Sequence, residues 1–368
     1  MRVIPIVCLI ASISTAMAEE NYWQKVIRPP EALSDKLPEI TLEGPKDNLV
    51  EEIPDHILKT NDRFFTISIE NDLFGSGVDR DYTNGLRFGY ANVGQEQPAF
   101  LHWLDRALPM FTINKTTTSY YSLGHNLYTP HTIKESGYIK NDRPYAAFLY
   151  GSVGMNTITE NHMDDVELTL GIVGPSAKGK QIQREFHKLK GVDKPKGWAH
   201  QIHDEPGVML SWERSYPGYY GAKIGNSIYT RVNPHYGVTV GNVYTYASAG
   251  ISLDITPRNM PWQAQPVRVR PALPGSGFFE TPDSGHSWMI FGGLDTRWVL
   301  RNIFLDGNTF KDSHSVKKKP FVLDAAIGAA YTYHQMRFTY TMNWRSKEFD
   351  SEHSRSAIFG SISLNYRF

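Results

Sequence analysis

The chain has 368 residues with 38 basic and 38 acidic side chains, and this balanced charge gives no indication of a nucleic-acid partner. Aromatic residues make up 12% of the chain, a load that suits β-sheets and the aromatic girdles of membrane barrels. The length fits two small domains or one large β-structure.

Residues 1–18 predict a secretory signal peptide. They begin with the basic Arg2, continue with an apolar run and end in an A-x-A cleavage pattern at residues 16–18. The only cysteine, Cys8, lies in this segment, so the mature chain is expected to lack disulfides and to depend on sheet closure for stability. No later run of 18 apolar residues predicts a transmembrane helix, which leaves a periplasmic protein or an outer-membrane barrel.

Residues 19–60 are rich in proline and acidic side chains and show no sustained period. This composition predicts a flexible periplasmic extension, for which a plain linker is the simplest reading. A periplasmic partner for the extension stays open.

From residue 62 onward, apolar and polar residues alternate with the period of a β-strand. In SAIFGSISLNYRF at the C-terminus, Ile358, Ile362 and Leu364 share one face, and Ser361 and Asn365 share the other. The same alternation predicts twelve strands, near residues 63–72, 83–93, 117–128, 145–156, 163–173, 206–216, 226–239, 242–253, 286–301, 320–331, 334–345 and 356–368.

The predicted fold is all-β, a twelve-stranded antiparallel transmembrane β-barrel over residues 61–368. An apolar face outside and Arg, Glu and Asn inside are typical of such barrels, whereas a soluble sandwich would turn its apolar face inward. The terminal Phe368 resembles the C-terminal signature of outer-membrane proteins. An even strand count predicts both termini in the periplasm and residues 73–82, 129–144 and 174–205 outside the cell.

Two segments fit this scheme less simply. Residues 254–285 are long and proline-rich for a periplasmic connection, so they either pack beneath the barrel or reveal an error in the strand register. Residues 97–108 predict a short amphipathic helix on the same side.

The first candidate site is the stretch SIENDLF. Because Ile69 faces lipid in the predicted register, Glu70 and Asp72 should face the lumen, and a bulge at the strand end could re-aim Asn71. Glu70 and Asp72 at the extracellular rim predict a hard-cation site. The alternative is an ordinary polar lumen with a solvated acidic loop.

The second candidate site is GKQIQREFHKLKG, residues 179–191, which has helical periodicity. Ile182, Phe186 and Leu189 form an apolar stripe expected to contact the barrel rim or an acyl chain. Ser176 is a candidate cap for the start of this helix, and Gly191 is expected to end it.

Gln183 and His187 lie one turn apart on an adjoining face of this helix, where both could address one ligand. Histidine suits general-base chemistry near neutral pH. The alternative is that His187 only hydrogen-bonds a loop.

The third candidate site is basic. A cationic cluster around the helix is expected to bind the anionic phosphates of lipopolysaccharide, and a solvated face is the alternative. Its members are Lys178, Lys180, Arg184, Lys188, Lys190, Lys194 and Lys196. In NDRPYAAFLYGSVG, Arg143 could pair with a phosphate or a catalytic carboxylate, and Pro144 could simply open the strand.

These pieces together resemble the lipid A 3′-O-deacylase family of Gram-negative outer membranes. The resemblance rests on SIENDLF, DRDYTNGLRFGY, NDRPYAAFLYGS, LTLGIVGPSAKGKQIQREFHKLKG, GWAHQIHDEP, GNVYTYASAG and RPALPGSGFFE, which occur in order over residues 62–368. It implies a twelve-stranded barrel in the outer membrane and Ca²⁺-dependent hydrolysis of the 3′-linked acyloxyacyl group of lipid A. We expect the enzyme to be a monomer.

The resemblance also implies site residues. By motif, the Asn-Asp pair falls on Asn71 and Asp72, and the Gln-x-x-x-His helix falls on Gln183 and His187. The candidates for its hydroxyl, basic and acidic residues, for the oxyanion or substrate, are Thr83, Arg143, Lys190 and Glu205. The metal is expected near Asp72 and Glu70.

Three functions are therefore compared. The favoured one is an esterase in which His187 activates water. An outer-membrane phospholipase of the His-x-Ser kind is disfavoured, because none of the 13 histidines is followed by serine two residues on. A non-enzymatic porin or adhesin explains the alternation but does not explain a Gln-x-x-x-His helix on the same side as an Asn-Asp strand end.

Overall fold

A computed structural model describes residues 26–27, 38–45, 63–75, 81–93, 111–191, 194–258, 279 and 284–368. Within these ranges, a few side chains also fall outside the description, among them those of Thr83, Leu189 and Lys190. Twelve strands dominate the fold: β3 (Arg63–Asn71), β4 (Asp81–Asn92), β5 (Thr118–Thr129), β6 (Ala146–Ile158), β7 (Met163–Val173), β8 (Glu205–Ser215), β10 (Ile228–Gly241), β11 (Tyr244–Pro257), β12 (His286–Asn302), β13 (Phe321–Tyr333), β14 (Met336–Arg345) and β15 (Ala357–Arg367).

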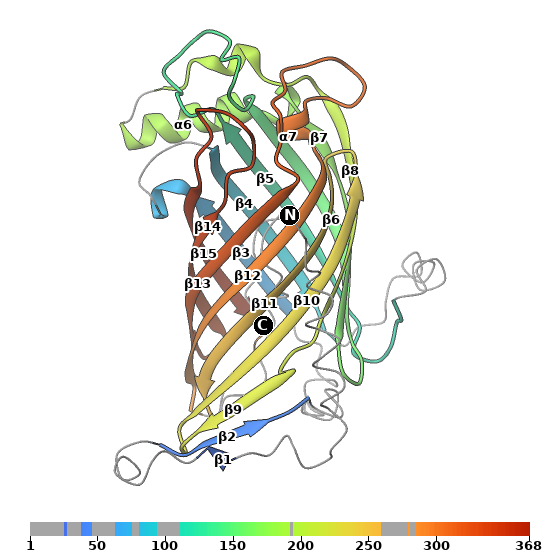
Figure 1. Cartoon of the computed structure of the whole chain (residues 1–368), viewed down its shortest axis with the longest axis vertical. Helices are drawn as coiled ribbons and strands as arrows, with labels where there is room; N and C mark the ends of the chain where they lie inside the picture. The colour runs from blue at the N-terminus through green and yellow to red at the C-terminus, as the bar shows by residue number, and fades with distance from the viewer. Residues whose placement is uncertain are drawn as a thin grey trace, which may run out of the picture.

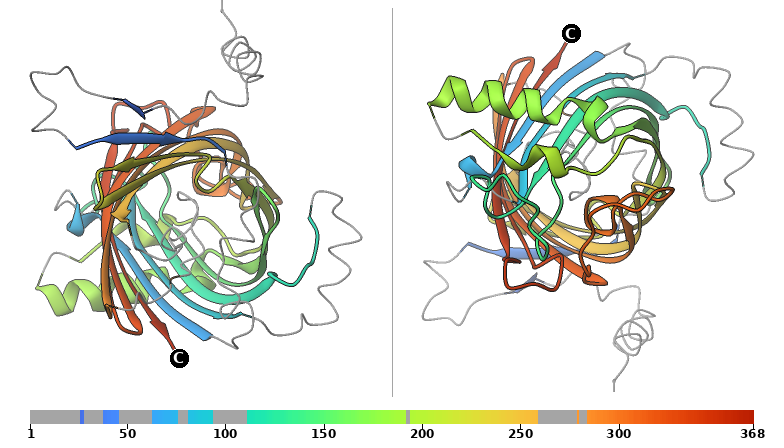
Figure 2. Two further views of the ribbon diagram at one scale, coloured as in Figure 1. Left: turned by 90° about the horizontal axis from the view of Figure 1, so that it is seen from below. Right: turned by 90° about the horizontal axis from the view of Figure 1, so that it is seen from above.

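These strands form a closed antiparallel barrel (Figures 1 and 2). Each pairs with the next one in the ring, β15 pairs with β3, and β8 pairs with β10. The predicted twelve-stranded barrel is confirmed, with every predicted strand overlapping an observed one. We call the end where β3 begins and β15 ends the terminal end. The opposite end carries the helix α6 (Gly179–Lys190) and is called the α6 end (Figure 1).

The alternation of the sequence becomes an apolar outer face and a polar lumen. On β3, Phe65 and Ile69 are 39% and 38% exposed, whereas Thr66, Ser68 and Glu70 are buried. When strands with this alternation close into a ring, the barrel wall is apolar on the outside and polar on the inside.

A packed apolar cluster fills the lumen at the α6 end. Its members come from β5, β6, β7, β8, β11, β12, β13 and β15, from the short helix α7 (Ile303–Asp306), and from two loop residues, Ile202 and Val243. The ring of Phe304 stacks on Tyr128 with centroids 4.0 Å apart, and the hydroxyls of Tyr128 and Tyr244 lie 2.8 Å apart. These contacts join opposite walls, so side chains cross the lumen at this level.

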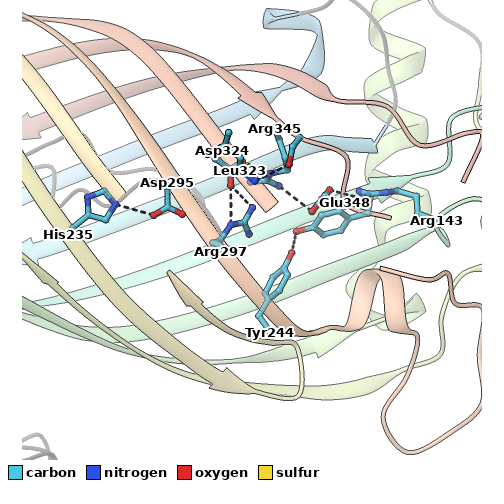
Figure 3. Close-up of polar contacts among 11 residues, drawn as sticks. Arg143, His235, Tyr244, Asp295, Arg297, Leu323, Asp324, Arg345 and Glu348 are labelled. Carbon is cyan, nitrogen blue, oxygen red and sulfur yellow. Dashed lines mark hydrogen bonds and ion pairs between the residues drawn. The ribbon is translucent and has the colours of Figure 1, made fainter. Parts of the chain in front are cut away.

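A chain of buried ion pairs lies beside this cluster (Figure 3). Arg143 contacts Glu348 at 2.7 Å, and Arg345 lies 3.8 Å from the other Glu348 oxygen. Arg345 also donates to Asp324 at 2.6 Å, and Arg297 Nε donates to the second Asp324 oxygen at 3.0 Å. The chain therefore ties β12, β13 and β14 to two loops at the α6 end.

Three short strands extend the sheet at the terminal end. β9 (Tyr220–Ile224) pairs with the part of β10 that β8 does not reach. β2 (Ile40–Glu43) pairs with β9, and β1 (Val26–Ile27) pairs with β2. The sequence predicted a flexible extension over residues 19–60; within it, β2 pairs with the edge that β9 offers, and β1 pairs with β2.

The proline-rich connection at 254–285 lies mostly outside the described residues, as does the helix predicted at 97–108. Phe279 is described and fully buried, and its ring meets the lumen-facing Phe64 edge-on at 5.6 Å. None of the helices described is long and apolar enough to cross a membrane.

Candidate functional site

The helix α6 is present where the sequence predicts it. It ends at Gly191, whose φ of 67° is left-handed and whose N–H bonds to the carbonyls of His187 and Lys188. Its start differs from the prediction. Lys178, with a φ of 61°, is the N-cap, because Pro175 opens a separate turn, η3 (Pro175–Ala177). Ser176 lies in that turn, where its hydroxyl donates to Asp204 at 2.7 Å.

The α6 helix is docked on the outer face of the barrel wall, not in the lumen. A Cβ on Gly179 would lie 2.5 Å from the Cβ of Ala147, so glycine permits this close approach to β6. Just before α6, the Ala177 carbonyl contacts His125 Nε2 at 2.8 Å. His125 faces outward, because it is in register with the exposed Leu149. From β6, α6 runs toward the side of β3 (Figures 1 and 2).

The face that α6 turns to the barrel is polar. Gln183 and His187 are 2% and 3% exposed, while Ile182 on the neighbouring face is 43% exposed and Phe186 is half-buried. The expected contact of the apolar stripe with the barrel is therefore not found for Ile182. A surface helix in water normally buries its apolar stripe, so burial of the Gln-His pair is unusual and makes this face a candidate site.

Trp198 fixes the orientation of Gln183. This tryptophan lies in η4 (Gly197–His200), is 1% exposed, and its indole N–H donates to Gln183 Oε1 at 2.8 Å. Because an indole can only donate, the amide oxygen must face it and the amide NH₂ must point away. Gln183 Nε2 is buried, and no hydrogen-bond partner for it exists among the described residues. Such a buried donor is costly unless a ligand or water uses it.

The Asn71–Asp72 pair lies on the same outer face. Asn71 has the outward parity of Ile69 but is only 2% exposed. After it, η1 (Asp72–Phe74) turns onto the outer face, where Tyr340 donates to the Phe74 carbonyl at 2.8 Å. In Figure 1, η1 lies beneath α6. Asp72 is 3% exposed.

Glu70 is separated from this group. It shares the buried lumen side of β3 with Ser68, whereas the turn η1 carries the chain outward after Asn71. The prediction that Glu70 and Asp72 face one lumen site assumed that strand alternation continues, and the 3₁₀ turn breaks it. Glu70 is therefore not grouped with Asp72.

Arg143 is also placed elsewhere. Its guanidinium contacts Glu348 and lies 5.7 Å from the centroid of the lumen-facing Tyr128 ring. The structure therefore places Arg143 in the lumen, paired with a loop carboxylate, and apart from the outer-face group.

Glu205 joins chain segments. Its carboxylate accepts from Asn242 Nδ2 at 2.9 Å, from the Thr309 backbone N–H at 2.8 Å and from Asn308 Nδ2 at 3.1 Å. These donors are all protein groups, so in this structure Glu205 holds the 307–309 loop.

The side chains of Thr83 and Lys190 lie outside the described residues. The backbone at Thr83 shows a register shift between Tyr82 and Asn84, in the strand beside Asn71. The remaining members of the cationic cluster are all exposed: Lys178, Lys180, Arg184, Lys188, Lys194 and Lys196.

Sequence reasoning missed Trp198 and His125. The motif GWAHQIHDEP contains Trp198 and contributed to the resemblance, yet spacing alone gave no reason to pair it with Gln183 across 15 residues. His125 has the outward parity of a lipid-facing position, and a polar residue there was the available signal for a covering element.

The similarity of this chain to one known family and to one solved structure of that family agrees with the fold. A sequence profile of the family described as "Outer membrane protein LpxR" matches residues 10–368. The structure of LpxR from Salmonella typhimurium is similar with a TM-score of 0.66 and 19% identity, over 82% of this chain and 99% of that one. The β domain of the Bordetella autotransporter BrkA matches with a TM-score of 0.37 and 7% identity, over 83% and 97%. No curated protein sequence matches this chain.

Proposed function

Because the chain belongs to the family of the outer membrane protein LpxR, we propose that it is an outer-membrane lipid A deacylase that hydrolyses the 3′-linked acyloxyacyl ester of lipopolysaccharide. One observation carries the proposal. A helix on the outer face of the barrel buries its Gln183–His187 stripe on the side where β3 delivers Asn71 and Asp72. A catalytic group on the outer wall suits a substrate that is itself a membrane lipid.

The position of the site favours lateral entry. If the α6 end faces the outside of the cell, the site lies at the level of the outer leaflet. The barrel wall below it is apolar, with Leu123, Leu149 and Leu170 at 55%, 38% and 54% exposure. Acyl chains can contact such a surface without leaving the bilayer.

In the proposed mechanism, His187 is the general base. Its imidazole takes a proton from water, and the water oxygen attacks the ester carbonyl carbon. Gln183 Nε2 would donate to the developing oxyanion or to the attacking water, and the bond from Trp198 to Oε1 supports this role. The protonated His187 then gives its proton to the leaving sugar oxygen, which leaves a free 3′-hydroxyl and a fatty acid.

Calcium fits this site through Asp72 and Asn71. The carboxylate and the amide oxygen are hard donors of the kind that Ca²⁺ prefers, and both residues are buried. Among the described residues no group of three or more His, Cys, Asp or Glu side chains is gathered for a metal, so carbonyls, water or substrate would complete the shell. Bound there, the ion would polarise the ester carbonyl. Glu70, on the lumen side, is left out of this proposal.

The two alternatives are less well supported. A phospholipase of the His-x-Ser kind lacks its motif in this sequence. A porin needs an open lumen, whereas the apolar cluster and the Arg143–Glu348 chain occupy the lumen at the α6 end.

The test is mass spectrometry of lipid A from cells that express the protein. Wild type and His286→Ala, an exposed histidine at the terminal end, should both remove the 3′ acyloxyacyl group, and His187→Ala should not. Intact 3′ chains with the wild type would refute the function, and processing by His187→Ala would refute the mechanism. A serine-directed covalent inhibitor should leave turnover unchanged, since no serine nucleophile is involved.

A further inference from the structure

The helix α6 carries three distinct stripes. Successive residues turn by about 100° around a helix. The buried stripe contains Gln183 and His187, Ile182 and Phe186 lie to one side of it, and a cationic stripe lies to the other. The cationic stripe consists of Lys180, Arg184 and Lys188, all exposed.

The direction of α6 decides which stripe faces which end of the barrel. Seen from above the α6 end, the helix starts near β6 and runs toward β3 along the outer wall (Figure 2). An observer looking along it from Gly179 has the barrel on the left. Because a right-handed helix turns clockwise as it recedes, Arg184 points away from the terminal end and Ile182 points toward it.

This orientation matches the surface around α6. Outward residues covered by the helix segment, His125 and Ala147, are buried, whereas Leu123, Leu149 and Leu170 on the terminal side of them are well exposed. The side chain of Ile182, 43% exposed, therefore borders the apolar band of the barrel. The cationic stripe lies on the far side of the helix, beyond that band.

We propose that α6 is an interfacial helix that binds outer-leaflet lipid in two layers. Acyl chains contact the stripe of Ile182 and Phe186, and anionic phosphate head groups bind Lys180, Arg184 and Lys188. The orientation of the α6 end rests on the proposed function, but the lipid contact does not depend on the reaction. Gly179 and Trp198 tie α6 to the barrel wall, and bound lipid covers its outward-facing stripes.

Single spin labels test the depth of each stripe. A Cys8→Ser background allows one labelled cysteine at a time, at Ile182, Arg184 or Glu185, all exposed. Glu185 points away from the barrel and is the matched control. The measurement is made in bilayers whose outer leaflet is lipopolysaccharide. The ratio of the label's collision rate with oxygen to its collision rate with a water-soluble nickel complex should be several-fold higher at position 182 than at 184 and 185. Equal ratios at 182 and 185 would overturn the proposal.

Charge reversal tests the phosphate layer. The label is kept at position 182, and phosphatidylcholine is replaced by anionic lipid. The label should then lie deeper in the bilayer when α6 is native, but not in the Lys180→Glu, Arg184→Glu, Lys188→Glu variant. A Lys311→Glu, Lys317→Glu control, on exposed positions of another loop, should behave as the native helix. If the label depth in the native helix did not depend on lipid charge, the proposed binding of phosphates by the cationic stripe would be overturned. Lipid A from the same cells is scored in parallel, so acyl removal with a water-exposed label at 182 would refute the interfacial helix while leaving the deacylase intact.

Discussion

The indole N–H of Trp198 donates a hydrogen bond to Oε1 of Gln183 at 2.8 Å, and both side chains are buried. The bond joins η4 to α6 and forces the amide NH₂ of Gln183 to face away from the indole. The geometry of the candidate site therefore depends on a residue 15 positions away that is not itself expected to touch the ester.

Trp198→Phe should test this positioning role. The phenyl ring keeps most of the packing against Tyr145 but cannot donate, so Gln183 can turn its amide. One neutral hydrogen bond is worth about 1 kcal/mol, which predicts a fall in lipid A turnover of roughly five- to tenfold. Turnover and thermal unfolding are measured together. Trp288→Phe, on the exposed outer face, should change neither. A fall in unfolding temperature that fully accounts for the lost turnover would argue against a positioning role.

Gly179→Leu should detach the start of α6 without unfolding the barrel. Even a Cβ at this position would lie 2.5 Å from Ala147 and from the Trp198 ring, so a larger side chain must push the helix off the wall. Activity should fall at least tenfold, while the heat-sensitive gel mobility typical of folded barrels is kept. Glu185→Leu, which adds the same side chain to an exposed position of α6, is the control. Unchanged activity of Gly179→Leu would show that this docking is dispensable.

The strand pattern made the barrel predictable, because a period of two is a local property of the sequence and each predicted strand was found. The face of the barrel on which Asp72 lies was not predictable in the same way. It follows Glu70 by two residues, and only the turn η1 separates their faces. The pairing of Arg143 with Glu348 was not predictable either, because Glu348 lies 205 residues away and no local signal reports such a contact. The helix α6 was predictable from its periodicity. That its polar face docks on the barrel was not, because this depends on the position of the barrel wall.

Glu348→Gln should destabilise the barrel mouth in a pH-dependent way. Burial tends to raise the pKa of Glu348, but Arg143, Arg345 and Arg297 outweigh it and hold that pKa below its ordinary value of 4.5. Because the folded-state pKa is lowered, the ion pairs contribute stability above pH 4.5 and lose it as the pH falls through the lower folded value. Breaking a buried pair costs about 3–5 kcal/mol.

Thermal unfolding of both proteins from acidic to neutral pH checks this expectation. The difference between wild type and Glu348→Gln should be largest at neutral pH and shrink below pH 4.5. Asp350→Asn serves as a control. Asp350 is an exposed residue in the same loop as Glu348, and it pairs with Lys319. A difference that does not vary with pH would mean that Glu348 acts through packing rather than charge.

Calcium should be needed for turnover, and Asp72 rather than Glu70 should set the concentration required. Chelation is expected to stop lipid A hydrolysis, and added Ca²⁺ should restore it. Asp72→Asn removes a charged oxygen donor from the outer-face site, so the Ca²⁺ concentration for half-maximal activity should rise at least about tenfold, which corresponds to about 1.4 kcal/mol. Glu70→Gln is the matched control, because Glu70 is one register position away from Asn71 but on the lumen side of β3. It should leave the calcium response unchanged. An equal shift in both variants would mean that the ion lies between the two faces of the strand end, and no shift in either would exclude Asp72 as its ligand.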